Sequence, residues 1–176
     1  MTTAVLSPAL RPEGDRTWKA DAACAGHPEP DLFYPDPAQT RRADQAKQIC
    51  EACPVSRICL DHALETRDRW GIRGGLTEEE RHPLHQLLPR RLDYERVAAA
   101  LEGHRVHLSR AERDAVVRVA HIRATPIPTW APVLKITRKH GRRLVTALHD
   151  QVGRQPHLAR QMAIEADLVE RMAAAA

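Results

Sequence analysis

The most constraining feature of this sequence is a group of three cysteines within ten residues. They are Cys50, Cys53 and Cys59, and the one remaining cysteine, Cys24, is separated from Cys50 by twenty-five residues. Four thiols form a complete ligand set for one tetrahedral metal ion or one cubane iron–sulfur cluster. We therefore expect the first part of the chain to fold around these four side chains.

The cysteine spacing alone leaves several chemistries open. A zinc ribbon usually has two Cys-x-x-Cys pairs, whereas this sequence has one, at Cys50 and Cys53. Zinc and an iron–sulfur cluster both fit the pattern, and two disulfides or four idle thiols are further alternatives. Thiol–disulfide exchange is another, because a Cys-x-x-Cys at a helix start lowers a thiol pKa, although no βαβ pattern accompanies it here.

Charge distinguishes the two halves of the 176-residue chain. Residues 1–88 contain 11 Lys and Arg against 14 Asp and Glu, whereas residues 89–176 contain 16 against 9. The basic half favours a polyanionic partner, with an ordinary solvated surface as the alternative. One Phe, two Tyr and three Trp are too few for a large aromatic core. Small helical units are expected instead, the first of them stabilised by a metal or cluster.

The hydrophobic periods predict an all-α protein. Helices are expected at 38–51, after Cys53-Pro54, from a capping box at Thr77 and Glu80 to residue 88, and at 93–102. The predicted organisation is a flexible arm at 1–14, a four-helix-type cluster domain at 15–88, a helix-turn-helix-like domain at 89–152 and a helical tail at 153–176.

The segment at 109–150 has the lengths of a helix-turn-helix unit. A capping box at Ser109 and Glu112 opens its first helix, a stiff connector follows at 125–129, a short helix is expected at 130–135, and a basic helix runs over 138–150. The predicted DNA contacts are Lys135, Arg138, Lys139, Arg142 and Arg143. A solvated basic helix is the alternative. Gly141 weakens this helix unless it permits close approach to a neighbour.

No apolar run reaches the length of a membrane span, and residues 1–20 lack a secretory signal. We therefore expect a cytoplasmic protein without a membrane partner. In a reducing cytosol, cysteines at this spacing are more often metal ligands or redox centres than structural disulfides.

The first half of the chain resembles the WhiB-like family of actinobacterial and actinophage regulators. The resemblance covers about residues 15–85 and is carried by these motifs: Cys24, Cys50-x-x-Cys53-x5-Cys59, a glycine-rich turn and Leu76-Thr77-Glu78-Glu79-Glu80-Arg81. It implies a 4Fe-4S cluster on Cys24, Cys50, Cys53 and Cys59, sensitive to oxygen or nitric oxide. It also implies a transcription regulator rather than an enzyme, one that often binds region 4 of the principal sigma factor. Cysteines freed by cluster loss can pair as disulfides.

The glycine-rich turn is the partner-binding segment that the resemblance implies, and it consists of Trp70, Gly71, Arg73, Gly74 and Gly75. This chain departs from the family pattern there, because Arg73 stands where a Trp associated with the sigma-factor contact is common. A guanidinium offers less apolar contact area than an indole and requires a different partner surface. We expect Trp70, three residues earlier, to pack against its own domain.

Overall fold

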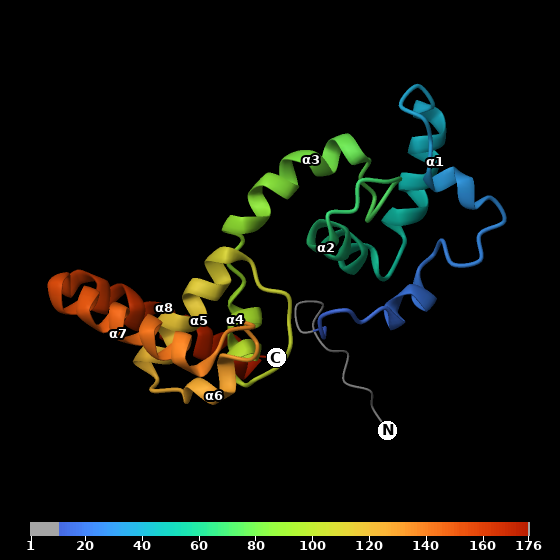
Figure 1. Ribbon diagram of the computed structural model, residues 1–176. Helices are drawn as coiled ribbons and strands as arrows, with labels where there is room; N and C mark the ends of the chain where they lie inside the picture. The colour runs from blue at the N-terminus through green and yellow to red at the C-terminus, as the bar shows by residue number, and fades with distance from the viewer. Residues whose placement is uncertain (1–10, 176) are drawn as a thin grey trace. The chain divides into compact units, whose positions relative to one another are not determined.

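The computed structural model describes residues 11–175, which are mainly helical. This range contains eight α-helices and three 3₁₀ helices, and the predicted all-α class is confirmed. None of these helices has the length and apolar composition needed to cross a bilayer. The described chain divides into two compact units, one formed by residues 14–89 and one by residues 90–175 with residues 11–13. Both can be followed along the colour ramp of Figure 1.

The unit at residues 14–89 is built from short helices. Its α-helices are α1 (Thr40–Glu51), α2 (Ser56–Thr66) and α3 (Glu78–Leu87), and its 3₁₀ helices are η2 (Thr17–Asp21), η3 (Pro30–Phe33) and η4 (Leu88–Arg90). The apolar cluster that joins η3 to α1 has four buried members, which are Leu32, Phe33, Ala46 and Ile72. Because so few apolar side chains gather there, polar bonds must carry much of the organisation of this unit.

Local sequence accounts for the helix starts in this unit. The Thr77 hydroxyl accepts a hydrogen bond from the Glu80 N–H, and the Glu80 carboxylate accepts one from the Thr77 N–H at 2.8 Å. The predicted capping box is therefore confirmed. α1 begins at Thr40 rather than at residue 38, and α2 begins at Ser56, so Pro54 lies before α2 rather than in its first turn.

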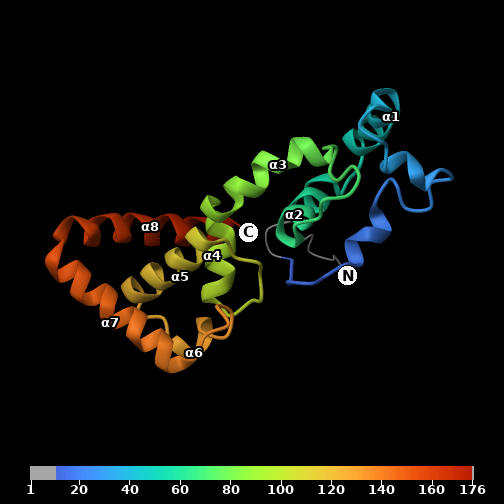
Figure 2. The ribbon, with the colours of Figure 1, turned by 45° about the horizontal axis from the view of Figure 1, so that its top comes forward.

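The unit at residues 90–175 has a larger apolar core. α4 (Tyr94–Leu101), α5 (Arg110–Ile122) and α8 (Pro156–Ala175) pack against one another, and α6 (Ile127–Trp130) and α7 (Arg138–Arg154) flank them, as Figure 2 shows. The core includes Val97, Ala100, Ala115, Val116, Val119, Trp130, Ala131 and Val169, all without solvent exposure.

The segment expected as a helical tail at 153–176 is helical over α8 (Pro156–Ala175), and this helix packs into the core. Met162 and Val169 of α8 are 1% and 0% exposed. Nε and Nη2 of Arg118 on α5 each donate to one oxygen of the Glu165 carboxylate of α8 at 2.7 Å. The amphipathic pattern of this segment thus reflects packing against α4 and α5. The arm predicted at 1–14 lies mostly outside the described residues, and Glu13 joins this unit through a 2.8 Å backbone bond to Arg105.

A buried carboxylate connects the starts of α4 and α5. Glu112 is fully buried and accepts hydrogen bonds from Arg91 Nε at 2.8 Å, from the Asp93 N–H at 3.2 Å and from the Ser109 N–H at 2.6 Å. The Ser109 hydroxyl in turn accepts from the Glu112 N–H at 3.1 Å, which confirms the predicted capping box. These partners offset the cost of removing a charged group from water.

The short helix before the basic helix lies earlier than predicted. We expected it at 130–135, but α6 spans Ile127–Trp130 and residues 131–135 form turns. The prolines of the supposed connector explain the difference, because proline is well accepted in the first turn of a helix, where its missing N–H has no intrahelical partner.

Gly141 allows α7 to approach α6 closely. It is the buried residue of α7, and a Cβ at this position would lie 2.8 Å from Ile127 Cγ2 and 3.3 Å from Trp130 Cη2. The distance to Ile127 Cγ2 is shorter than the contacts that Cβ atoms make in proteins. The absence of a side chain at this glycine therefore lets the two helices cross in close contact.

We predict that Gly141→Ala destabilises the protein, although alanine is the better helix former. Overpacking should lower the free energy of unfolding by about 1–3 kcal/mol. Gly153→Ala is the matched control on the same helix, because nothing lies within 4 Å of its Cβ position, and it should be neutral or stabilising by up to about 1 kcal/mol. Chemical unfolding followed by circular dichroism measures both. Equal stability of the two variants would contradict the role assigned to Gly141.

Candidate metal centre

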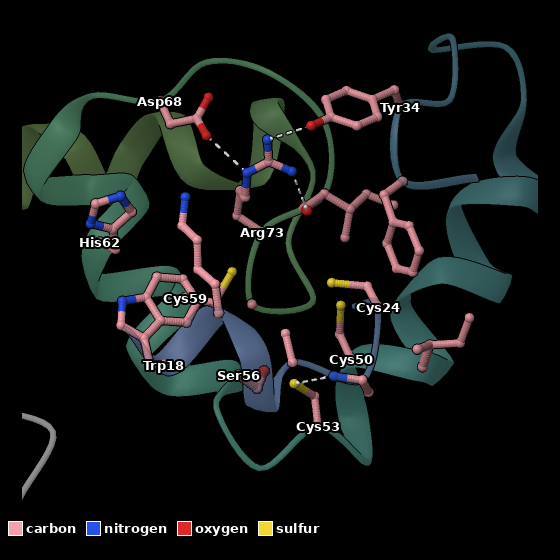
Figure 3. Close-up of a pocket in the computed structure, with 17 residues that line it drawn as sticks. Trp18, Cys24, Tyr34, Cys50, Cys53, Ser56, Cys59, His62, Asp68 and Arg73 are labelled. Carbon is pink, nitrogen blue, oxygen red and sulfur yellow. Dashed lines mark hydrogen bonds and ion pairs between the residues drawn. The ribbon is translucent and has the colours of Figure 1, made fainter. Parts of the chain in front are cut away.

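The four cysteines line one cavity of about 270 Å³ in the unit at residues 14–89. They reach it from different segments, as Figure 3 shows: Cys24 from the loop after η2, Cys50 from the end of α1, Cys53 from the turn between α1 and α2, and Cys59 from α2. All four are free thiols. The fold of the protein chain itself therefore brings together side chains as far apart in the sequence as Cys24 and Cys59.

Two local features explain how the chain gathers these sulfurs. At the corner between α1 and α2, the Cys53 N–H donates to the Cys50 carbonyl at 3.2 Å and the Cys59 N–H donates to the Val55 carbonyl at 2.9 Å. The loop that carries Cys24 is joined to this corner because the Ala23 N–H donates to Cys53 Sγ at 3.4 Å. The corner and the loop thus face the same cavity.

The glycine-rich turn supplies further donors to the sulfurs. Backbone hydrogen bonds run from Gly75 to Cys50 and from Gly74 to Cys59. Gly74 has a φ of +56°, and a Cβ there would lie 2.6 Å from Leu60 Cβ, so another residue would be strained and crowded. The turn is therefore part of the sulfur site. The sequence connects this turn only with a protein partner. The spacing of the cysteines does not predict hydrogen bonds from the turn to their sulfurs.

The cavity walls control the charge of the thiols. Burial raises the pKa of Cys50 and of Cys59, while the backbone hydrogen bonds and the nearby Arg73 guanidinium act in the opposite direction. In the metal-free protein these two thiols are therefore protonated at neutral pH. A metal or cluster that takes thiolate ligands has to displace those protons, which links its binding to pH.

The donor set fits a soft metal site. Four thiols without a carboxylate or imidazole among the proposed ligands suit zinc or an iron–sulfur cluster. Within residues 11–175, no group of three or more Cys, His, Asp or Glu side chains is close enough together to hold a metal ion as the structure stands. The four thiols line one cavity, and the sulfurs of Cys50, Cys53 and Cys59 accept backbone N–H bonds, as cluster ligands commonly do.

Arg73 points into this site rather than toward solvent. Its Nε donates to Asp68 Oδ2 at 2.8 Å, Nη2 to the Tyr34 hydroxyl at 2.9 Å and Nη1 to the Ile72 carbonyl at 3.1 Å. The guanidinium also lies over the Tyr34 ring, 5.1 Å from its centroid. In Figure 3 the side chain stands among the residues that line the cavity.

Trp70 does not pack against its domain, so that expectation is wrong. Its side chain is 73% exposed. The Trp70 N–H donates to Asp68 Oδ1 at 3.0 Å, and its carbonyl accepts from Arg81 at 3.4 Å. Both backbone groups are bonded inward, and the indole is left on the surface.

Arg81 braces the whole turn from inside. It is fully buried, and its guanidinium donates to the carbonyls of Gly71 and Leu76 at 2.7 Å, of Asp68 at 3.2 Å and of Trp70 at 3.4 Å. A single side chain on α3 therefore holds the segment that supplies donors to two of the sulfurs. Its only sequence signal is its place at the end of the motif that begins at Leu76.

The predicted DNA contacts lie in the other unit, and four of the five share α7. Arg138, Lys139, Arg142 and Arg143 are exposed, and none has an ion-pair partner within the described part of the chain. The opposite side of α7 bears its buried or partly buried residues, which are Gly141, Leu144, Val145, Leu148 and Val152. Lys135 differs from the other four, because it precedes α7 and forms a 2.9 Å ion pair with Glu13.

The fold and the site together define a class of protein. It is an all-helical chain whose first unit gathers four free thiols around one cavity and whose second unit exposes a basic helix. Comparison with known families assigns the first unit more closely, because the family model described as "Transcription factor WhiB" matches residues 18–84. The chain belongs to the WhiB family of transcription factors, as the cysteine and glycine motifs predicted.

Several named relatives share this segment. WhiB2 of Mycobacterium tuberculosis is 41% identical over 75 residues, which cover 43% of this chain and 81% of the relative. WhiD of Streptomyces coelicolor is 41% identical over 71 residues, 38% of this chain and 63% of WhiD. The regulator WhiB3 of M. tuberculosis, named as redox- and pH-responsive, is 40% identical over 68 residues, 36% of this chain and 67% of WhiB3.

These relatives are named as transcriptional regulators, which agrees with the expectation of a regulator rather than an enzyme. The family model ends at residue 84. The unit that begins at residue 90 therefore lies outside the matched segment.

We predict that Arg81→Met disrupts the glycine-rich turn. Four backbone carbonyls would lose a buried donor, so the free energy of unfolding of this unit should fall by about 3 kcal/mol or more. Hydrogen exchange at the Ile72 amide, which donates to the Phe33 carbonyl at 2.7 Å, should become fast. Arg69→Met is the control, because Arg69 is exposed, and its effect should stay within about 0.5 kcal/mol. Similar behaviour of both variants would show that Arg81 does not brace the turn.

Proposed function

We propose that this protein is a redox- or nitric-oxide-responsive transcriptional regulator of the cytoplasm. In this proposal Cys24, Cys50, Cys53 and Cys59 hold a 4Fe-4S cluster, and α7 binds double-stranded DNA. One observation carries the proposal most directly: four free thiols line one cavity, and three of their sulfurs accept backbone hydrogen bonds. The relative named redox- and pH-responsive is consistent with a sensing role.

The size of the unit explains how such a site could report a signal. When bound, the cluster supplies iron that reacts with oxygen or nitric oxide and that accepts or releases an electron. The four cysteines come from four segments of a unit with a small apolar core. Loss of the cluster, which all four cysteines would hold, would therefore remove a cross-link between those segments. Oxygen can then oxidise the freed thiols to disulfides, accepting two electrons and two protons per bond, which makes the change persist until a reductant acts.

Two alternatives use the same cysteines. A thiol–disulfide exchange protein needs a thiol with a lowered pKa, whereas burial raises the pKa of Cys50, the first cysteine of the Cys-x-x-Cys pair. A zinc protein has the same donor set. Zinc differs from the cluster in a measurable way, because it gives no visible absorption and brings no inorganic sulfide.

The second unit supports the DNA-binding part of the proposal by its distribution of cations. Three arginines of the α5 region bind within the unit: on α5, Arg118 pairs with Glu165 and Arg113 donates to the Leu134 carbonyl, and Arg123, just after α5, donates to the Ala166 carbonyl. The cations of α7 have no such partners among residues 11–175 and lie on one exposed side. Unpaired cations in such a row can neutralise DNA phosphates and so release the counterions condensed on them, and we propose the first turn of α7 as the reading end of a helix-turn-helix unit.

We assign Arg138, Lys139, Arg142 and Arg143 to the DNA surface. Lys135 remains part of the proposal as a cation at its edge, and it must exchange Glu13 for a phosphate. This exchange makes its contribution to binding smaller than that of an unpaired cation.

We also propose region 4 of the principal sigma factor as the protein partner of the glycine-rich turn. Arg73 is engaged inside the cavity, so it offers little surface to a partner. Trp70 is the most exposed large hydrophobic side chain of the described residues. A rigid exposed indole is a suitable anchor for a protein interface, and it provides the apolar contact that Arg73 lacks.

We predict that Cys53→Ser abolishes cluster binding. A serine hydroxyl is a poor substitute for a thiolate on iron, so protein purified without oxygen should lose its visible absorption together with bound iron and sulfide. Ser56→Ala is the matched control, because Ser56 lines the same cavity without being a proposed ligand. An unchanged spectrum in Cys53→Ser would refute the ligand assignment, and zinc in place of iron and sulfide would favour the alternative.

We predict that Arg142→Ala with Arg143→Ala weakens DNA binding and reduces its dependence on salt. Each lost phosphate contact lowers the magnitude of the slope of log K against log salt by about 0.9, so two lost contacts reduce it by about 2. Arg41→Ala with Arg160→Ala removes the same charge from exposed positions outside α7 and should change the slope little. The measurement is fluorescence anisotropy with labelled duplex DNA over a salt series. Equal slopes for the two double variants would exclude α7 as the DNA surface.

A further inference from the structure

Arg73 is a charged residue of the sulfur cavity that the four-ligand scheme does not use. It lines the same cavity as the four cysteines. Three of its nitrogens donate hydrogen bonds, to Asp68, Tyr34 and the Ile72 carbonyl. Bonds in three directions and the contact with the Tyr34 ring fix the guanidinium in place. The positive charge therefore stays at the cavity wall instead of moving into solvent.

The charge of Arg73 acts on the sulfurs. Burial raises the pKa of the Cys50 and Cys59 thiols, and the charge of Arg73 opposes part of that rise at both positions. The pKa of Arg73 itself is raised, because its bonds to Tyr34 and Asp68 outweigh the effect of burial. The guanidinium is consequently charged at neutral pH.

Other charged groups near the site set the background for this effect. Lys19 and Asp68 also line the cavity, and the buried Arg81 interacts electrostatically with Asp68 and Cys59. Asp68 is the one carboxylate among the residues that line the cavity, and it lies against Arg73, where it offsets part of that charge. The surroundings of the sulfurs are therefore positive overall, with Arg73 and Asp68 as opposing charges at one point of the wall.

We propose that Arg73 is an electrostatic positioning residue that raises the reduction potential of the cluster. This inference rests on the proposed function, because it requires a 4Fe-4S cluster on the four cysteines. Four thiolates give the bound cluster a net negative charge, and one-electron reduction makes it more negative. A fixed cation at the wall stabilises the reduced state more than the oxidised state. Asp68 works in the opposite direction and sets the size of the effect.

Removing Arg73 and removing Asp68 should shift the midpoint potential of the cluster in opposite directions, which structural damage would not do. Removing the cation by Arg73→Leu should lower the midpoint potential, with the equilibrium constant for one-electron reduction falling about tenfold, which corresponds to about 59 mV. Removing the anion by Asp68→Asn should raise the potential. Arg73→Lys keeps the charge, so its midpoint potential should be closer to that of the unaltered protein than the potential of Arg73→Leu is. General loosening of the cavity would shift the midpoint potentials of all three variants in the same direction.

The test is a spectroelectrochemical titration of the anaerobically purified full-length protein and these variants. Iron and sulfide content and the electron paramagnetic resonance spectrum of the reduced state establish that each sample contains the cluster. Arg69→Leu removes a cation from the exposed loop outside the cavity and should leave the potential unchanged. A lower potential in Arg73→Leu together with a higher one in Asp68→Asn supports the assignment.

The failure of this inference can be distinguished from failure of the proposed function. If the unaltered protein binds no 4Fe-4S cluster, the proposed function fails and this inference falls with it. If the unaltered protein binds the cluster and Arg73→Leu has the same potential, the inference alone is overturned. If Arg73→Leu does not retain the cluster, Asp68→Asn decides the matter, since an unchanged or lower potential in that variant overturns the inference.

Discussion

The cysteine-bearing unit depends on polar bonds between segments that its small apolar core cannot hold alone. Arg81 is the centre of these bonds, because one buried guanidinium binds four carbonyls of the glycine-rich turn. The turn then donates backbone hydrogen bonds to Cys50 and Cys59. The position of two sulfurs is thus set from α3, a helix that contributes no cysteine of its own. A metal or cluster would complete an arrangement that the chain has already prepared.

The second unit is stabilised in a different way. α4, α5 and α8 bury a continuous set of aliphatic side chains, and the ion pairs of Glu112 and Glu165 lie where these helices meet. This unit is therefore held by apolar packing and by ion pairs between its own helices, and α7 packs against α5, α6 and α8. In the proposed function, a change at the cysteines alters the first unit, while affinity for DNA resides in the second.

Features that depend on near neighbours in the sequence were predicted well. Both capping boxes and the helical class follow from residues within a few positions of each other. The cysteine spacing identified side chains that share a cavity. The errors concern contacts between distant segments: the inward bonds of Arg73 to Tyr34, the exposure of Trp70 and the packing of α8 into the core. An amphipathic period shows that a helix has a buried side, but it does not show which partner covers that side.

The carboxylate of Asp68 has two oxygens, and each serves a different side of the turn. One accepts from the guanidinium at the cavity wall, and the other accepts from the backbone of the exposed indole residue. A protein that grips the indole and shifts its backbone must therefore also disturb the anion beside the sulfurs. By thermodynamic reciprocity, any change in the sulfur chemistry that moves this anion must alter how firmly such a protein is bound. A single acidic side chain thus bonds both to the interior and to the surface of this unit.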